Sequence, residues 1–78
     1  MPIPKKRDPL LLKFGDSLRR HRETAGHSQE RLAELAELDR TYISDIERGN
    51  RNPGIKNVAR IAKALGITTD VLCRGVDL

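Results

Sequence analysis

The sequence predicts an all-α domain of five short helices, and two observations support this fold class. Breakers end each apolar period at even intervals along the 78 residues, at Gly26, Gly49, Pro53-Gly54 and Gly66. No stretch alternates between apolar and polar residues with the period of two that marks a strand. The length is that of one domain.

The first helix is expected over residues 10–25. It follows a loose, flexible tail of residues 1–9, which holds three prolines and four charges. The inward face carries Leu11, Phe14, Leu18, His21 and Ala25 at helical spacing. Gly26 is then the left-handed residue that ends the helix. His21 and a second histidine, His27, have no third ligand type beside them, so we predict no metal and no cofactor.

Residues 28–49 predict two short helices joined by a tight corner. Ser28 and Asp39 are good N-caps, so a helix should follow each of them. The apolar arc of the earlier helix is Leu32, Ala33, Leu35 and Ala36. A connection of about three residues, Glu37-Leu38-Asp39, forces the two helices to cross steeply, near 90–120°. This is the physical pattern of a helix-turn-helix.

The fourth helix is expected from Lys56 or Asn57 to Leu65, closed by Gly66. A short fifth helix follows, capped by Thr68 or Thr69. The domain then spans residues 10–75, with 76–78 as the C-terminal end. The lone Cys73 cannot form an intrachain disulfide and is interpreted as a small packed hydrophobe, which favours a reducing cytoplasm. No apolar run approaches the roughly 18 residues that a membrane span needs.

The helix that follows Asp39 has a compact polar face. At 100° per residue, Arg40, Ser44, Arg48, Thr41 and Asp45 fall on one arc, and Ile43 and Ile46 face the other way. Arginine can bond to guanine O6 and N7, threonine can meet thymine, and aspartate can accept from cytosine N4. The alternative is an ordinary solvated face.

The loop after this helix, residues 48–54, is basic and rich in amides and glycine. Such side chains and close backbone N–H groups suit phosphate oxygens. Gln29, at the start of the second helix, could bond a phosphate together with the helix dipole. A plain turn made of turn-forming residues is the alternative.

The net charge of +4 is unevenly distributed. Residues 1–26 carry seven basic and three acidic residues, and residues 50–66 carry four basic residues and no acid. Residues 27–49 hold three basic and six acidic residues. The two basic blocks therefore flank an acidic helix-turn-helix, and they are the expected source of phosphate attraction.

The stretch SQERLAELAELDRTYISDIERGNRNP resembles the helix-turn-helix of the phage repressor and Cro (Xre) family of bacterial regulators. The resemblance runs from about Phe14 to Leu72 and includes Leu32-Ala33, Ile43-Ser44-x-Ile46-Glu47-x-Gly49 and Ile61-Ala62-x-Ala64-Leu65-Gly66. Within the family, LDRTYIS followed by IERGNRNP is similar to the controller proteins of restriction–modification systems. The implied function is sequence-specific transcription regulation, on double-stranded DNA, in the bacterial cytoplasm at the nucleoid.

The resemblance also implies a role for each matching position. The base readers would be Arg40, Thr41, Ser44 and Asp45. The backbone anchors would be Gln29, Tyr42, Arg48, Asn50, Arg51, Asn52 and Lys56. Arg22 and Glu47 match a structural ion pair. Glu37 departs from the pattern, because it takes a turn position where the family usually has glycine; a positive φ there would cost about 1 kcal/mol.

A palindromic operator bound by a homodimer is expected, with half-sites about 34 Å apart. Candidate dimer residues are Ile55, Ile67, Val71, Leu72 and Val76, although they could simply complete the core. One other function is an antitoxin-type regulator that also binds a toxin protein. Another is a protein-interaction module without DNA binding, favoured by the acidic residues Glu34, Glu37, Asp39 and Asp45. No Ser/His/Asp, Cys/His or metal-ligand spacing indicates an enzyme.

Overall fold

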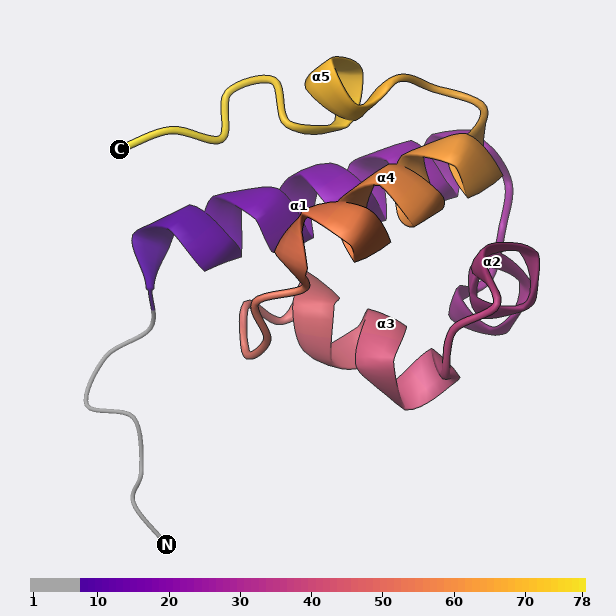
Figure 1. Ribbon diagram of the computed structural model, residues 1–78. Helices are drawn as coiled ribbons and strands as arrows, with labels where there is room; N and C mark the ends of the chain where they lie inside the picture. Colours follow the sequence, from indigo (N-terminus) through magenta and orange to yellow (C-terminus); the bar gives the residue numbers. More distant parts are fainter. Residues whose placement is uncertain (1–7) are drawn as a thin grey trace, which may run out of the picture.

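A computed structural model describes residues 8–78 and contains five helices (Figure 1). They are α1 (Pro9–Thr24), α2 (Gln29–Ala36), α3 (Arg40–Glu47), α4 (Gly54–Leu65) and α5 (Thr69–Leu72). The described residues contain no strand, so the all-α, five-helix prediction is confirmed. The expected tail lies mostly outside the described residues, but Asp8 caps α1 and Pro9 is its first residue. Within residues 8–78, no helix combines the length and the apolar character that crossing a bilayer requires.

Side-chain caps explain where the first three helices begin. Carboxylate or hydroxyl oxygens of Asp8, Ser28 and Asp39 accept hydrogen bonds from first-turn backbone N–H groups at 2.8–3.0 Å. The start of α4 differs from the prediction: α4 begins at Gly54, two residues before Lys56. Its N-cap is Pro53, which has no side-chain cap bond, so no capping residue marked this boundary.

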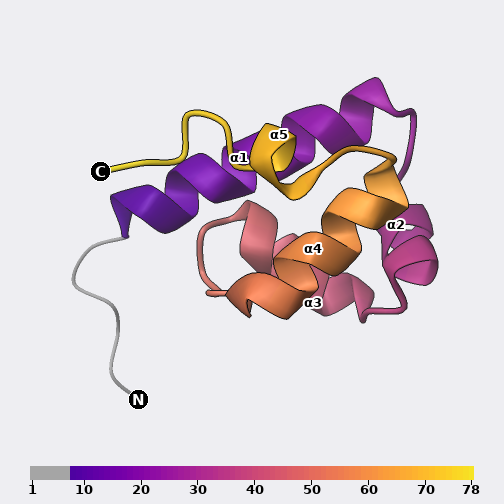
Figure 2. The ribbon, with the colours of Figure 1, turned by 45° about the horizontal axis from the view of Figure 1, so that its top comes forward.

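α1 lies along one side of the molecule, and the other helices pack against it and one another (Figures 1 and 2). α3 contacts α1 and α2, α4 contacts α2, and α5 lies between α1 and α4. The core comprises Phe14, Leu18, Leu32, Ala33, Ala36, Ile43, Ile46, Val58, Ile61, Ala62 and Leu72. Gly15 makes the contact between α1 and α3 possible, because a β-carbon there would collide with the backbone carbonyl oxygens of Ile46 and Glu47.

The C-terminal segment is tied to α1. The Ser17 hydroxyl is buried and donates to the Leu72 carbonyl oxygen at 2.6 Å. The Lys13 ammonium donates to the Asp77 carbonyl oxygen at 2.8 Å, and Val76 packs against the core. α5 and the end of the chain are therefore part of the folded unit.

Two leucines lie where the sequence did not predict them. Leu72 was a candidate dimer residue but is fully buried (0% exposed), because α5 is covered by both α1 and α4. It cannot lie on a dimer surface. Leu35 was expected on the inward arc of α2, yet it is 40% exposed at the edge of that arc.

Candidate nucleic-acid interface

The outer face of α3 carries the predicted base-reading residues. Arg40 and Thr41 are exposed, and Ser44 and Asp45 are half-buried. Ile43 and Ile46, on the opposite face, are fully buried. The Arg48 guanidinium donates to the Asp45 carboxylate at 2.7 Å, three residues away. The face therefore consists of donors from Arg40 and Thr41 next to a carboxylate that is already shared with an arginine.

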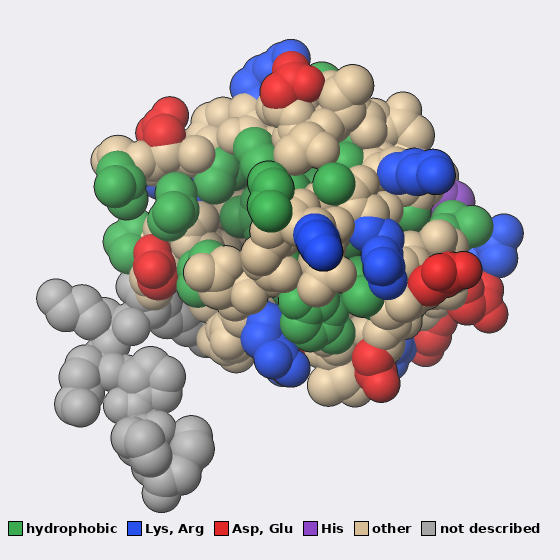
Figure 3. Space-filling view, in the orientation of Figure 1, with side chains coloured by type: hydrophobic (Ala, Val, Ile, Leu, Met, Phe, Trp, Pro, Cys, Tyr) green, Lys and Arg blue, Asp and Glu red, His purple; other side chains and the backbone are tan. Residues whose placement is uncertain are grey.

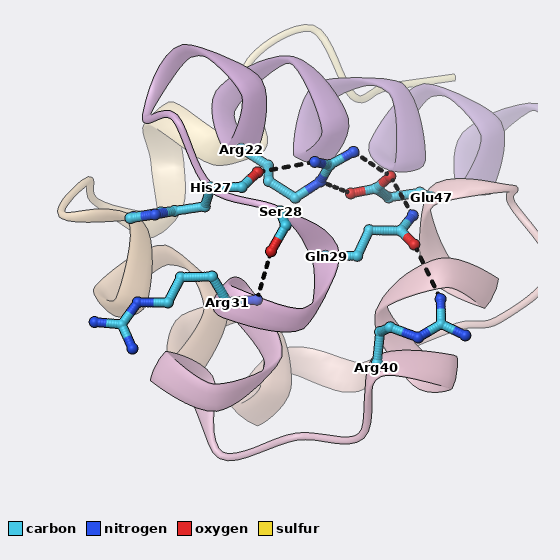
Figure 4. Close-up of polar contacts among 7 residues, drawn as sticks. All are labelled: Arg22, His27, Ser28, Gln29, Arg31, Arg40 and Glu47. Carbon is cyan, nitrogen blue, oxygen red and sulfur yellow. Dashed lines mark hydrogen bonds and ion pairs between the residues drawn. The ribbon is translucent and has the colours of Figure 1, made fainter.

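A buried ion pair supports this face from behind (Figure 4). Arg22 of α1 donates from Nε to Glu47 Oε2 at 2.6 Å and from Nη2 to Glu47 Oε1 at 3.1 Å. Its Nη1 also donates to the His27 carbonyl oxygen at 2.9 Å. The two side chains are only 12% and 5% exposed. The hydrogen bond to Glu47 raises the pKa of Arg22, and the pair joins α1 to the end of α3.

Gln29 extends this pair to the face itself. Its Nε2 donates to Glu47 Oε1 at 2.9 Å, and its Oε1 accepts from Arg40 Nη1 at 3.3 Å (Figure 4). Because the Glu47 carboxylate can only accept, it holds the amide nitrogen of Gln29 inward and turns the amide oxygen toward Arg40. Four side chains thus connect α1 to the first residue of α3.

Tyr42 holds the loop that follows α3. Its hydroxyl donates to the Pro53 carbonyl oxygen at 3.2 Å and accepts from Asn57 Nδ2 at 3.0 Å. The Arg51 guanidinium lies over the ring, 4.9 Å from its centre. The expected anchor Tyr42 therefore has its hydroxyl proton engaged within the protein and positions Arg51. Sequence reasoning missed Asn57, although its place one turn after Pro53 was a usable signal.

The remaining predicted residues are spread over two surfaces. Asn50, Arg51, Asn52 and Lys56 are exposed in and just after the α3–α4 loop. Of the candidate dimer residues, Ile55 is 73% exposed, whereas Ile67, Val71 and Val76 are half-buried. Hydrophobic side chains gather over the start of α4 and along the C-terminal segment (Figure 3). Residues 8–78 contain no group of three or more His, Cys, Asp or Glu side chains that could hold a metal ion.

Comparison with known proteins finds relatives of this chain. The family described as Helix-turn-helix matches residues 18–72. Control protein C.BamHI of Bacillus amyloliquefaciens is 51% identical over 59 residues, which cover 74% of this chain and 73% of that protein. Control protein C.MunI of Mycoplasma sp is 40% identical over 69 residues, covering 87% and 93%.

Solved structures of two controller proteins are also similar to this chain. The restriction-modification controller protein C.AhdI from Aeromonas hydrophila matches with a TM-score of 0.78 at 47% identity, covering 80% of this chain and 94% of that one. The controller protein C.Esp1396I, solved as a tetramer in complex with its natural 35 base-pair operator, matches with a TM-score of 0.81 at 39% identity, covering 88% and 91%.

Proposed function

This chain belongs to the helix-turn-helix family, and we propose that it is a sequence-specific transcription regulator of the restriction–modification controller type. It binds a palindromic operator as a homodimer, in the bacterial cytoplasm at the nucleoid. The observation that carries the proposal is the exposed polar face of α3, which is fixed to α1 and α2 by the Arg22–Glu47 pair. The control-protein relatives, one of them solved on its operator, support it.

Base reading is assigned to Arg40, Thr41, Ser44 and Asp45, with α3 in the major groove. Arg40 is well placed to change partners, because its present partner is a neutral amide oxygen at 3.3 Å on the surface. Two hydrogen bonds to guanine O6 and N7 would replace that single contact. Gln29 then acts as the residue that positions Arg40 before DNA arrives.

Phosphate contacts are assigned to the rim of this face. Gln29 keeps one N–H free beside its bond to Glu47, and it is the first residue of α2. Arg51, held over Tyr42, and its neighbours Asn50 and Asn52 reach phosphates on the other side of α3. Arg48 and Lys56 complete the set. These groups supply affinity for any sequence, whereas the α3 face supplies specificity.

The dimer surface is assigned to Ile55, Ile67, Val71 and Val76. Ile55 is 73% exposed, and a second copy would cover it together with the half-buried Ile67, Val71 and Val76. A two-fold dimer matches a palindrome with half-sites about 34 Å apart.

Two substitutions test the groove assignment. Arg40→Ala should cost about 1–3 kcal/mol of operator affinity and relax selection at one base pair per half-site. Arg51→Ala should weaken binding to all sequences alike and reduce the salt slope by about 1 per site. Both side chains are exposed, so the melting temperature serves as the control for folding: it should stay unchanged for Arg40→Ala and fall slightly for Arg51→Ala, which loses a contact with the Tyr42 ring worth about 0.5–1 kcal/mol.

The measurement is selection of bound sequences from a random duplex pool for each variant, followed by salt-dependent affinity on the selected site. The wild-type pool also shows the palindrome and the half-site spacing. If Arg51→Ala altered base preference and Arg40→Ala did not, the placement of α3 in the groove would be wrong.

A further inference from the structure

A groove of about 620 Å³ runs between the end of α2 and the outer side of α4, away from the polar face of α3. We infer that it binds an acidic amphipathic helix of a partner protein. The inference rests on the side chains that line the groove, and Ile55 is not among them. Ile55 lies beside the groove, because Ala59 is about one turn along α4 from it, whereas the cations of the groove lie about 80–140° around the helix from Ile55.

The floor of the groove is apolar. Leu35 of α2 is 40% exposed there, and Ala59 and Ala64 of α4 lie across from it. A leucine beside small side chains forms a shallow depression that an apolar side chain can enter. This is the usual way in which a groove receives one face of an amphipathic helix.

The rim of the groove is basic and its charges are not neutralised. Lys56, Arg60 and Lys63 line it, and α4 contains no acidic residue. Within residues 8–78, neither Arg60 nor Lys63 forms an ion pair or a hydrogen bond, whereas Arg19, Arg20 and Arg31 are each paired with a carboxylate nearby. Glu37 lies at the α2 end of the groove and is the acidic residue of its lining.

The spacing of the cations matches a helical ligand. Lys56, Arg60 and Lys63 are separated by four and then three residues, so they form a row about 10 Å long on one face of α4. Glutamates with the same spacing on a partner helix would face this row while an apolar residue between them covers Leu35. A surface of this size supports a weak, transient complex.

A protein fits this groove better than a DNA backbone does. Phosphates would leave the Leu35 and alanine floor uncovered. α4 also runs from the α3–α4 loop toward α2, so Arg60 and Lys63 lie progressively farther along the helix from the loop than Lys56 (Figures 1 and 2). The proposal therefore depends on Leu35, Arg60 and Lys63, and not on Lys56.

The test uses the isotope-labelled full chain and a synthetic peptide probe. The probe is an alanine-based helix of about 15 residues that carries leucines and a row of glutamates spaced four and three residues apart. Amide chemical shifts should change around Leu35, Ala59 and Ala64 and saturate at high peptide concentration, as expected for a small interface. A peptide with glutamine in place of glutamate should bind at least about tenfold more weakly.

Variants locate the binding site. Arg60→Glu combined with Lys63→Glu should weaken the probe at least about tenfold, and Leu35→Ser should weaken it as well. Arg74→Glu, an exposed charge reversal outside the groove, is the matched control and should leave binding unchanged. Absence of saturable shifts, equal binding of the glutamine peptide, or shifts centred on α3 would each overturn the proposal.

A DNA titration tests whether the groove binds DNA instead of a protein. Arg60→Gln combined with Lys63→Gln should leave the salt slope of operator binding unchanged if the groove serves a protein. A slope reduced by about 0.9 for each removed charge would show that these residues contact phosphates, and the inference would fail. The proposed DNA-binding function would stand in that case.

Discussion

Replacing Glu37 with glycine should make the domain more stable. Glu37 ends α2 with φ 58° and ψ 45°, and it is the one non-glycine residue with positive φ among residues 8–78. The left-handed turn is needed there, since the next N–H, that of Leu38, donates to the Ala33 carbonyl oxygen at 2.9 Å. The Glu37 side chain is exposed and forms no hydrogen bond or ion pair within the described chain, so its removal costs no contact of that kind.

The expected gain follows from two opposing terms. A residue with a β-carbon pays about 1–2 kcal/mol in the left-handed region. Glycine avoids this strain but loses about 0.5–1 kcal/mol more conformational free energy on folding. The net gain in the free energy of unfolding should be about 0.5–1 kcal/mol. For a domain of this length that raises Tm by about 2–8 °C.

Thermal unfolding followed by circular dichroism at 222 nm, at one fixed protein concentration, measures this gain. The concentration must be fixed because dimerisation couples Tm to it. Glu37→Ala is the matched control: it removes the carboxylate and keeps the β-carbon. If alanine stabilised the domain as much as glycine, the effect would come from the charge, and if neither variant raised Tm, the turn would carry no strain.

Three further changes test other contacts. Gly15→Ala should lower the free energy of unfolding by about 1–3 kcal/mol, because its β-carbon would lie 2.6 Å from the Glu47 carbonyl oxygen; an unchanged urea midpoint would contradict this. Arg22→Ala should cost about 3–5 kcal/mol by leaving Glu47 buried without its cation. Lost operator affinity with unchanged melting would instead make Arg22 a DNA contact. Burial raises the pKa of the Cys73 thiol, so alkylation at pH 8 should be slower in the native protein than in urea. Because the unfolded thiol ionises first, stability should fall as pH rises through the unfolded pKa, and Cys73→Ser should lack that fall.

Helix starts were predictable where a side chain caps the first turn. Ser28 and Asp39 place α2 and α3 within a residue of their actual starts, because the capping oxygen and the N–H it accepts from are neighbours in sequence. Pro53 offers no capping oxygen, and the Pro53-Gly54 pair was interpreted as a break although α4 begins there. The starts of α2 and α3 were thus predicted correctly because a capping side chain marks them, and the start of α4 was predicted wrongly because none does.

Burial at the edges of helices could not be predicted from periodicity. Leu35 fits the apolar arc of α2 as well as Ala36 does, but it lies at the edge of the surface that α2 packs against α3 and α4 and stays 40% exposed. Leu72 shows the reverse case, since a four-residue helix gives no periodicity, and the packing of α5 on both α1 and α4 buries it. Gly15 also gave no sequence signal, because its requirement comes from a backbone 31 residues away.

The polar face of α3 was predictable from the sequence, whereas the contacts that hold it in place were only partly predictable. The arc of Arg40, Thr41, Ser44 and Asp45 follows from helix geometry alone. The resemblance supplied the Arg22–Glu47 pair, and the structure joins these residues at 2.6 Å. Neither source indicated that Gln29 bonds both Glu47 and Arg40, because such a bridge depends on how α2 crosses α3.

The acidic character of residues 27–49 is a weak argument against DNA binding, because most of these carboxylates already have a partner within the fold. Glu34 is paired with Arg31, Asp45 with Arg48, and Glu47 with Arg22, while the Asp39 carboxylate caps α3. Four of the six acids therefore have their charge opposed within about 3 Å by a cation or a helix N-terminus. The two that remain are Glu30 and Glu37. Arg40 leads the α3 face and has only an amide as partner, so its charge is available to DNA. A protein-interaction module without DNA binding would not need Arg40, held only by the Gln29 amide, at the tip of that face. A gel shift that compares Arg40→Ala with the wild type decides between this module and a DNA-binding regulator.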